Sequence, residues 1–343
     1  MDYVYVLVSS DKDTYLEQTI LSIESLKRVV NTHNVNVIID SKTRDSLTNR
    51  RKKLYDVADN VLVIDCPSGY DTQQRSRYLK NTMYSHILHD FIYIDGDTIV
   101  CEDISTAAGY YNLAMVLDRH SLVSEHPRAK RIGKRANRCG FHNSFEDKHF
   151  NGGFMYVKKS PESERFFLLW NYLWREGLKH NITQDQASLN ETNFRMGGVI
   201  HELDGTYNCQ ICDVAGMRFL NDAKVIHYFA SGGSRIPFNL ADDKIIRHTL
   251  DETYPEGLRL VLDSPKLVFR FIKHYIAESS AGKVCSSNVF RLTFELNNSE
   301  SAASQVLYRL MEHSSILILA IRRWERLCAK AFNRLRLKSL RRR

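Results

Sequence analysis

Hydrophobic residues open the chain as a continuous run over residues 3–8, Y-V-Y-V-L-V, rich in β-branched and aromatic side chains. Such a short run is typical of a buried β-strand. From residue 15 to residue 30 the pattern changes, because Ile20, Ile23, Leu26 and Val30 recur at three- and four-residue spacing. That spacing predicts an amphipathic helix directly after the first strand.

The same alternation continues to residue 94, with strand signals at 35–39, 61–64 and 91–94 and helical signals at 44–57 and 75–88. Strands that alternate with helices predict a parallel sheet covered by helices, with ligands at the carboxyl ends of the strands. The loop after the first strand reads S-S-D-K-D at residues 9–13 and contains no G-x-G-x-x-G. It therefore disfavours a dinucleotide fingerprint and a P-loop.

After residue 100 the pattern becomes mixed. We expect strands at 113–117, 154–157 and 225–229, and helices at 161–175 and from residue 185. Residues 119–149 are polar, rich in Arg, Lys and His, and show little periodicity, which predicts a long binding or mobile loop. The predicted fold class is α/β, a Rossmann-like mixed sheet flanked by helices, in a domain of residues 1–260. A basic helical extension is expected over residues 261–343.

Positive charge is concentrated at the C-terminus. The whole chain carries a net charge of +8, yet residues 319–343 hold eight Arg and two Lys against one Glu, a net of +9. The rest of the chain is therefore nearly neutral. A protein that binds nucleic acid usually spreads basic residues over a domain face, so this distribution argues against a nucleic-acid partner.

The tail places Ile316, Ala320, Trp324, Leu327 and Ala331 at three- and four-residue spacing, with arginines and lysines on the remaining turns. This pattern predicts a basic amphipathic helix, which is suited to the headgroup region of an anionic membrane. The alternative is a C-terminal helix that docks on the domain through its apolar stripe.

Cysteine usage and the N-terminus bear on location. The chain has seven cysteines without a clustered framework, which fits a reducing compartment. Cys209 and Cys212 form a lone C-x-x-C, which we interpret as two unlinked thiols rather than a zinc or redox motif. The first residues show no signal-peptide pattern. We expect a cytoplasmic protein, peripheral on the inner face of a membrane.

The sharpest chemical motif follows the strand at 91–94, where the chain reads Asp95-Gly96-Asp97. In an extended chain the side chains at i and i+2 point to the same side, and Gly96 between them permits close backbone approach. Two carboxylates at a strand end suit a hard divalent cation, which binds diphosphate oxygens. Two alternatives remain, namely solvated acids in an ordinary turn and the paired aspartates of an aspartyl-phosphate hydrolase.

Several motifs in order resemble nucleotide-sugar glycosyltransferases of the GT-A fold, most closely family 8, which includes glycogenin and bacterial lipopolysaccharide galactosyltransferases. The resemblance covers roughly residues 3–240. It rests on the opening strand 4–10, S-R-Y-L at 76–79, Y-I-D-G-D-T-I-V at 93–100, F-N-G-G-F at 150–154, D-Q-A-S-L-N at 185–190 and I-H-Y at 226–228.

The resemblance implies a GT-A fold and a retaining transferase that moves a hexose from a UDP-sugar to a glycan or glycolipid acceptor. It implies Mn²⁺, or Mg²⁺, on Asp95, Asp97 and His227. Donor-binding residues would be Val8, Ser9, Ser10, Arg77, Asp95, Gly96, Asn151, Gly152 and Arg235. Asn151 and Asp185 would bind sugar hydroxyls, and Gln186 would lie against the face of the anomeric carbon. Asp185 and Gln186 would be the catalytic residues.

One motif departs from the family pattern. The family's late motif is often H-[FY]-x-G-x-x-K-P-W, with the Lys reaching the diphosphate. This chain has H-Y-F-A-S-G-G-S-R-I-P-F at 227–238, so Arg235 stands for the Lys in a shifted register. Arginine is a competent phosphate partner. A third hypothesis is a catalytically silent membrane adaptor with the same fold. If the chain is an enzyme, the basic loop between Arg119 and Arg138 would be an acceptor-facing lid.

Overall fold

The computed structural model describes residues 1–32, 34–144, 147–211, 216, 218–229, 240, 246–251, 254–266, 306, 307 and 310. Two compact units are distinguished, residues 1–234 with 238–282, and residues 235–237 with 283–343. The architecture below concerns the first unit. Residue 260, where the sequence suggests a boundary, lies inside the helix α10 (Glu256–Asp263). The basic tail and Arg235 lie outside the described residues.

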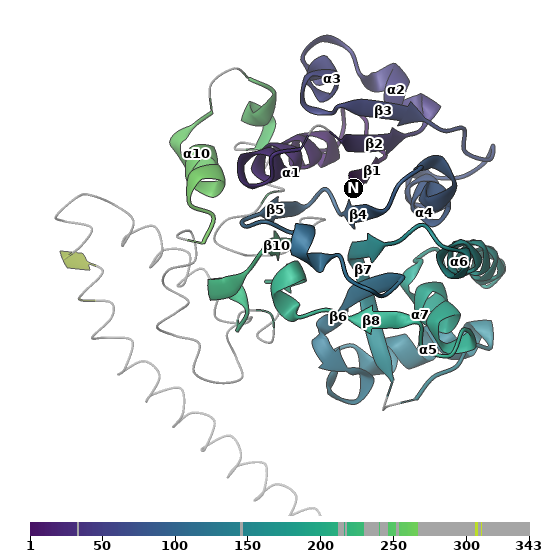
Figure 1. Cartoon of the computed structure of the whole chain (residues 1–343). Helices are drawn as coiled ribbons and strands as arrows, with labels where there is room; N and C mark the ends of the chain where they lie inside the picture. Colours follow the sequence, from purple (N-terminus) through teal and green to yellow (C-terminus); the bar gives the residue numbers. More distant parts are fainter. Residues whose placement is uncertain are drawn as a thin grey trace, which may run out of the picture. The chain divides into compact units, whose positions relative to one another are not determined.

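A seven-stranded sheet with the order β3-β2-β1-β4-β7-β6-β8 forms the centre of this unit (Figure 1). Its strands are β1 (Asp2–Leu7), β2 (Val35–Ile39), β3 (Asn60–Val63), β4 (Phe91–Ile94), β6 (Leu113–Leu122), β7 (Lys148–Val157) and β8 (Ile200–Glu202). β1 pairs in parallel with β2 and β4, and β2 with β3, as the alternation predicts. β7 runs antiparallel to both β4 and β6, which makes the sheet mixed. The predicted fold class is confirmed.

A second sheet has the order β5-β10-β9, with β5 (Thr98–Val100), β10 (Val225–His227) and β9 (Cys209–Gln210). β10 runs antiparallel to β5, so that His227 lies opposite Thr98. Because β5 follows β4 after the turn at residues 95–97, the small sheet brings the end of β10 beside that turn. The strand expected over 225–229 is observed over 225–227.

Helices cover both faces of the large sheet. They are α1 (Tyr15–Val29), α2 (Ser41–Ser46), α3 (Leu54–Val57), α4 (Thr72–Thr82), α5 (Ala129–Cys139), α6 (Pro161–Lys179), α7 (Gln186–Arg195) and α10. Short 3₁₀ turns lie at Asn49–Lys53, Met83–His86, Ser105–Ala107, Val123–Glu125, Gly205–Asn208, Leu220–Asp222 and Arg247–Leu250. Within the described residues, no helix is both long and apolar enough to cross a membrane.

Side-chain alternation along β1 sorts these helices into two layers. Tyr3, Tyr5 and Leu7 point toward α1 and α3 in one buried cluster, and Val4 points to the opposite cluster with α4, α6 and α7. Figure 1 shows α1 on one side of the strands and α4 and α6 on the other. The carboxyl ends of β1 and β4 thus meet at one edge, where the sequence places its polar motifs.

Three expectations are wrong in detail. The stretch 119–149 is not a loop, because it contains the end of β6, the helix α5 and the start of β7. In α5 the apolar residues Ala129, Ile132, Ala136 and Cys139 do recur at three- and four-residue spacing, but they are few and mostly small among arginines and lysines, so the polar composition hides the helix. The helix expected over 44–57 is broken into α2, a 3₁₀ turn and α3. The strand expected at 154–157 begins earlier, at Lys148.

Candidate active site

The turn after β4 presents two carboxylates at the sheet edge. The four residues of β4 are buried, and the Asp95 backbone N–H donates to the carbonyl of Gly153 across the sheet, at 2.8 Å. The Thr98 hydroxyl donates to the Asp95 carbonyl, also at 2.8 Å, which closes the turn. A Cβ on Gly96 would lie 2.3 Å from the Thr19 Oγ1, so only glycine fits here against α1.

His227 completes a three-residue cluster. Its Nε2 lies 3.2 Å from Asp97 Oδ1 and 4.0 Å from Asp95 Oδ2. One ligand atom from each of the three residues falls within 4.8 Å of the others. The pairing of β10 with β5 produces this approach, because it sets His227 opposite Thr98, next to Asp97. The sequence motifs predicted these three residues as one set, and the structure brings them together.

Hydrogen bonds behind the cluster define which nitrogen of His227 carries a proton. The Gly153 backbone N–H can only donate, so the Asn151 atom at 2.8 Å is its oxygen. That oxygen also accepts from the amide nitrogen of Asn208 at 3.0 Å, which leaves the Asn208 oxygen 2.9 Å from His227 Nδ1. Nδ1 therefore carries a hydrogen, and Nε2, the nitrogen that faces the carboxylates, is the one whose lone pair would bind a metal when the ring is neutral.

Electrostatics at the cluster favour a bound cation. Burial lowers the pKa of His227, but Asp97 and Asp95 outweigh that effect and raise it above its ordinary value. Burial would raise the pKa of Asp95, but Lys80, His227 and Tyr93 bring it down to about 2. Two carboxylates and an imidazole nitrogen directed at one point form an O/O/N set that suits a divalent metal. The residues present fit such a metal.

Lys80 is a site residue that sequence reasoning missed. Its ammonium group lies 3.0 Å from Asp95 Oδ1, where the Tyr93 hydroxyl also donates at 2.5 Å, and it sits over the Tyr93 ring. Lys80 is only 4% exposed. A lysine in a predicted amphipathic helix gives no sign of burial. Gly152 lies beside it, and a Cβ there would make an ordinary contact with the Lys80 Nζ at 3.4 Å.

A cavity of about 410 Å³ opens beside the aspartates. Five residues expected at the donor site or metal line it, namely Val8, Arg77, Asp95, Gly96 and Asp97. The remaining lining is Val6, Leu7, Tyr15, Gln18, Thr19, Thr72, Gln73, Ser76 and Tyr93. This volume is within the usual range for small-molecule sites.

Ser9 and Ser10, expected to bind the donor, do not belong to the lining of this cavity. Both hydroxyls donate to the Asp13 carboxylate, Ser9 at 2.6 Å and Ser10 at 2.9 Å. Arg51 donates in turn to the Ser9 hydroxyl. These contacts shape the loop between β1 and α1, and a donor contact by either serine stays a prediction.

Arg77 and Asp185 form an ion pair between α4 and the start of α7, with the Arg77 Nε 3.2 Å from Asp185 Oδ1. Asp185 is the main cause of the raised pKa of Arg77. The adjacent Gln186 donates to the Phe150 carbonyl at 3.2 Å and lines a second cavity. The two predicted catalytic residues therefore lie between the two cavities.

Asn151 and Gly152 occupy the β7 segment between the same cavities. Asn151 is 6% exposed. Its side-chain amide forms hydrogen bonds with the side chains of Asp118 and Asn208 and with the backbone N–H of Gly153. Two roles stay predictions, namely the binding of sugar hydroxyls by Asn151 and the donor contact of Gly152. The donor contact of Arg235 also stays a prediction, because Arg235 lies outside the described residues.

Comparison with known proteins places the fold. No family profile and no curated protein sequence matches the chain. Among solved structures, galactosyltransferase LgtC in complex with donor and acceptor sugar analogues is similar, with a TM-score of 0.50 and 14% identity over 76% of this chain and 99% of LgtC. The chain has a GT-A fold. Mouse xyloside xylosyltransferase 1 also matches, with a TM-score of 0.43 and 12% identity over 66% of this chain and 96% of that chain.

Proposed function

We propose that this chain is a metal-dependent glycosyltransferase that moves a hexose from a UDP-sugar to a glycan or glycolipid acceptor with retention of anomeric configuration. One observation carries the proposal. Asp95, Asp97 and His227 converge at the edge of a cavity that Arg77 also lines. This arrangement offers a cation site and a guanidinium group to the same diphosphate.

The proposed roles follow from position. Mn²⁺, or Mg²⁺, held by the three ligands would stabilise the negative charge that develops on the leaving nucleoside diphosphate. Arg77 supplies fixed positive charge in the same cavity, and its guanidinium is paired with Asp185. Gln186 is too weakly nucleophilic to form a covalent glycosyl intermediate, so attack by the acceptor on the face that the diphosphate leaves is the mechanism we favour.

The direct test measures UDP release from a panel of UDP-sugars with Mn²⁺, with Mg²⁺ and with EDTA. We expect release from one or a few donors with metal and none with EDTA. Asp97→Asn conserves shape and removes a ligand charge, and should lower kcat/KM by at least about 100-fold, the rate equivalent of ~3 kcal/mol. Metal-independent release, or full activity of Asp97→Asn, would contradict the proposal.

Two alternatives give different results in the same assay. An aspartyl-phosphate hydrolase would release phosphate from p-nitrophenyl phosphate with Mg²⁺ and ignore UDP-sugars. A silent adaptor would bind vesicles and show no metal-dependent binding of UDP or UDP-sugar.

We also propose that residues 319–343 hold the enzyme on the inner face of a membrane. The support is the +9 charge and the apolar spacing of that segment. Deletion of residues 319–343 should abolish sedimentation with vesicles containing phosphatidylserine, while donor hydrolysis is retained. Unchanged sedimentation of the deletion variant would refute the membrane role.

A further inference from the structure

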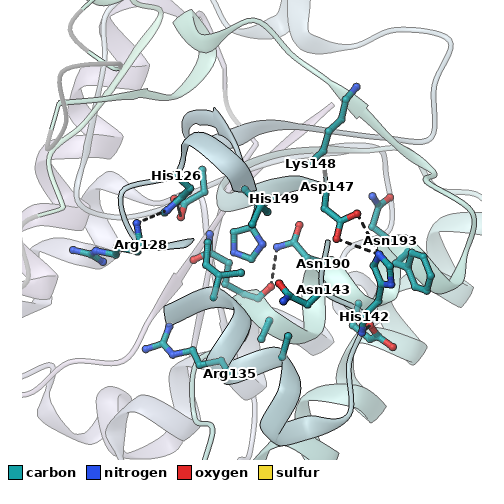
Figure 2. Close-up of a pocket in the computed structure, with 18 of the residues that line it drawn as sticks. His126, Arg128, Arg135, His142, Asn143, Asp147, Lys148, His149, Asn190 and Asn193 are labelled. Atoms are coloured by element: carbon teal, nitrogen blue, oxygen red, sulfur yellow. Dashed lines mark hydrogen bonds and ion pairs between the residues drawn. The ribbon is translucent and has the colours of Figure 1, made fainter. Parts of the chain in front are cut away.

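A second cavity, of about 370 Å³, lies between α5, the start of β7 and α7 (Figure 2). Its cationic side chains are Arg128, Arg131, Arg135 and Lys148, and three histidines, His126, His142 and His149, also line it. In the view of Figure 2, Arg128 and Arg135 lie to one side of His149, and His142 and Asp147 lie to the other. The proposed chemistry at the metal cluster makes no use of these basic groups.

The three arginines share one face of α5. Their spacing of three and four residues brings Arg128, Arg131 and Arg135 onto the side of the helix that lines the cavity. None of them has an acidic partner among the residues that the structure describes. Burial, followed by the charges of Arg131 and Arg128, lowers the pKa of Arg135. Like charges are therefore held together without a protein counterion in the described part.

Acids that line the same cavity are already engaged. Asp118 accepts from Asn151 at 2.9 Å and lies 3.0 Å from His126 Nε2. Glu191 accepts from Arg195 at 2.6 Å and from the His142 backbone N–H.

The third acid, Asp147, accepts from the Ser144 backbone N–H at 2.7 Å and lies beside the His142 ring. Lys148 is likewise matched, since it pairs with Glu202 at 3.0 Å. Four cationic side chains and three carboxylates thus line the cavity, and the three arginines are the cations among them without an acidic partner in the described part.

We infer that this cavity binds a phosphate group carried by the acceptor, so that the acceptor is a phosphorylated sugar; this rests on the proposed function. Guanidinium groups donate paired hydrogen bonds that match phosphate oxygens. A cavity of this volume holds a monosaccharide phosphate. An anion there relieves the repulsion among Arg128, Arg131 and Arg135.

The position of the cavity agrees with an acceptor site. Gln186 lines it, and the preceding Asp185 forms the ion pair with Arg77, which lines the donor cavity. Asn190, one turn further along α7, also lines the cavity and exchanges hydrogen bonds with the Phe150 backbone, at 2.7 and 3.3 Å. An acceptor with its phosphate on α5 would thus direct its sugar toward Gln186.

The test measures binding by calorimetry on the full chain, with four probes: glucose 6-phosphate, inorganic phosphate, glucuronate and glucose. We expect glucose 6-phosphate to bind at least tenfold more tightly than glucose and than glucuronate. Inorganic phosphate should compete with it. Equal affinity for glucose and glucose 6-phosphate would overturn the inference, and preference for glucuronate would overturn the choice of phosphate.

A matched pair of variants locates the site. Arg131→Gln with Arg135→Gln removes two charges from the cavity, whereas Lys130→Gln with Lys134→Gln removes two from a separate hollow on the same helix. The arginine variant should weaken binding of glucose 6-phosphate at least tenfold, and the lysine variant by less than twofold. Equal loss in both would show general charge attraction and refute a specific site. If the double arginine variant has a markedly lower melting temperature than the unmodified chain, Arg131→Gln alone is compared with Lys130→Gln alone. Arg131 is exposed, so its substitution should not disturb the fold.

UDP binding separates this inference from the proposed function. The unmodified chain could bind UDP in a metal-dependent way and yet show no preference for glucose 6-phosphate over glucose. That result would refute the phosphorylated acceptor and would still agree with the proposed transferase activity. Specific binding of glucose 6-phosphate by a chain that binds no UDP would refute the transferase and with it the acceptor role of the cavity.

Discussion

The Asn208 side-chain oxygen accepts a hydrogen bond from His227 Nδ1 at 2.9 Å. Asn208 and His227 are both buried, at 0% and 2% exposure. The bond fixes the imidazole so that Nε2 faces the two aspartates. Asn208 comes from the 3₁₀ turn at Gly205–Asn208 and does not itself reach the aspartates, so it acts as a positioning residue for the proposed metal centre.

Asn208→Ala should weaken Mn²⁺ binding by about 10- to 100-fold, because the ring loses the partner that holds its tautomer. Calorimetry with Mn²⁺ alone measures this without any substrate. Asn36→Ala is the control, since Asn36 is also a buried asparagine but lies on β2 and bonds only the Asn34 carbonyl. If both variants bound Mn²⁺ like the unmodified chain, Asn208 would have no role at the metal.

Gly153→Ala should damage the metal cluster more than Gly152→Ala does. A Cβ on Gly153 would lie 2.5 Å from His227 Cε1 and 2.8 Å from the Asn151 oxygen, whereas one on Gly152 would meet Lys80 at 3.4 Å. We expect Gly153→Ala to lower the free energy of unfolding by about 1–3 kcal/mol and to abolish Mn²⁺ binding. Urea unfolding measures the stability of the two variants, and calorimetry measures their Mn²⁺ binding. Equal effects of Gly153→Ala and Gly152→Ala would show that the Cβ at residue 153 does not clash with His227.

Lys80→Met should strengthen Mn²⁺ binding by about tenfold in the absence of donor. The lysine ammonium lies 3.0 Å from Asp95 Oδ1 and repels a cation bound nearby. Unit charges about 5 Å apart interact with ~3 kcal/mol at an effective dielectric constant of about 20, so a tenfold gain is well within reach. A weaker Mn²⁺ affinity in Lys80→Met would show that the lysine supports the ligand geometry instead.

His149 should make the chain sensitive to acid. Burial lowers its pKa from 6.5 to about 4, although Asp118 and Asp147 act in the opposite direction, while His126 and Arg135 reinforce the shift. The unfolded state therefore binds more protons between about pH 6.5 and pH 4, and stability falls as the pH falls through that window. The loss attributable to His149 is at most about 3 kcal/mol.

His149→Gln removes that titration. Between pH 7 and pH 4, the free energy of unfolding of the unmodified chain should fall more than that of His149→Gln, as measured by urea unfolding at each pH. Parallel pH profiles for the two proteins would show that His149 does not titrate in this way.

Local patterns in the sequence were sufficient to predict the four parallel strands of the first hundred residues and the helix α1, because these strands are short apolar runs, but the patterns did not show that the predicted helix over 44–57 is broken. The grouping of Asp95, Asp97 and His227 came from the resemblance to family 8 and not from local patterns. Local patterns failed for α5, whose apolar residues are few and mostly small among arginines and lysines, and for the register of β7, whose first residues are polar yet paired with β6.

Lys80 and Asn208 show a further limit. Each matters through a partner remote in the chain, Asp95 for the lysine and His227 for the asparagine. Nothing in the neighbouring residues of either side chain signals burial. Such roles depend on how β7 and β10 pack beside β4, which is a property of the tertiary structure.

The pairing of β5 with β10 has a thermodynamic consequence. The three proposed ligands come from two segments far apart in the chain, which only the complete fold brings together. A divalent ion at that point acts as a non-covalent cross-link and binds the native state in preference to the unfolded one. At a hundred times its dissociation constant it should add about 2.7 kcal/mol to the stability. The melting temperature of the intact chain in Mn²⁺ is therefore a read-out of metal occupancy that needs no knowledge of donor or acceptor.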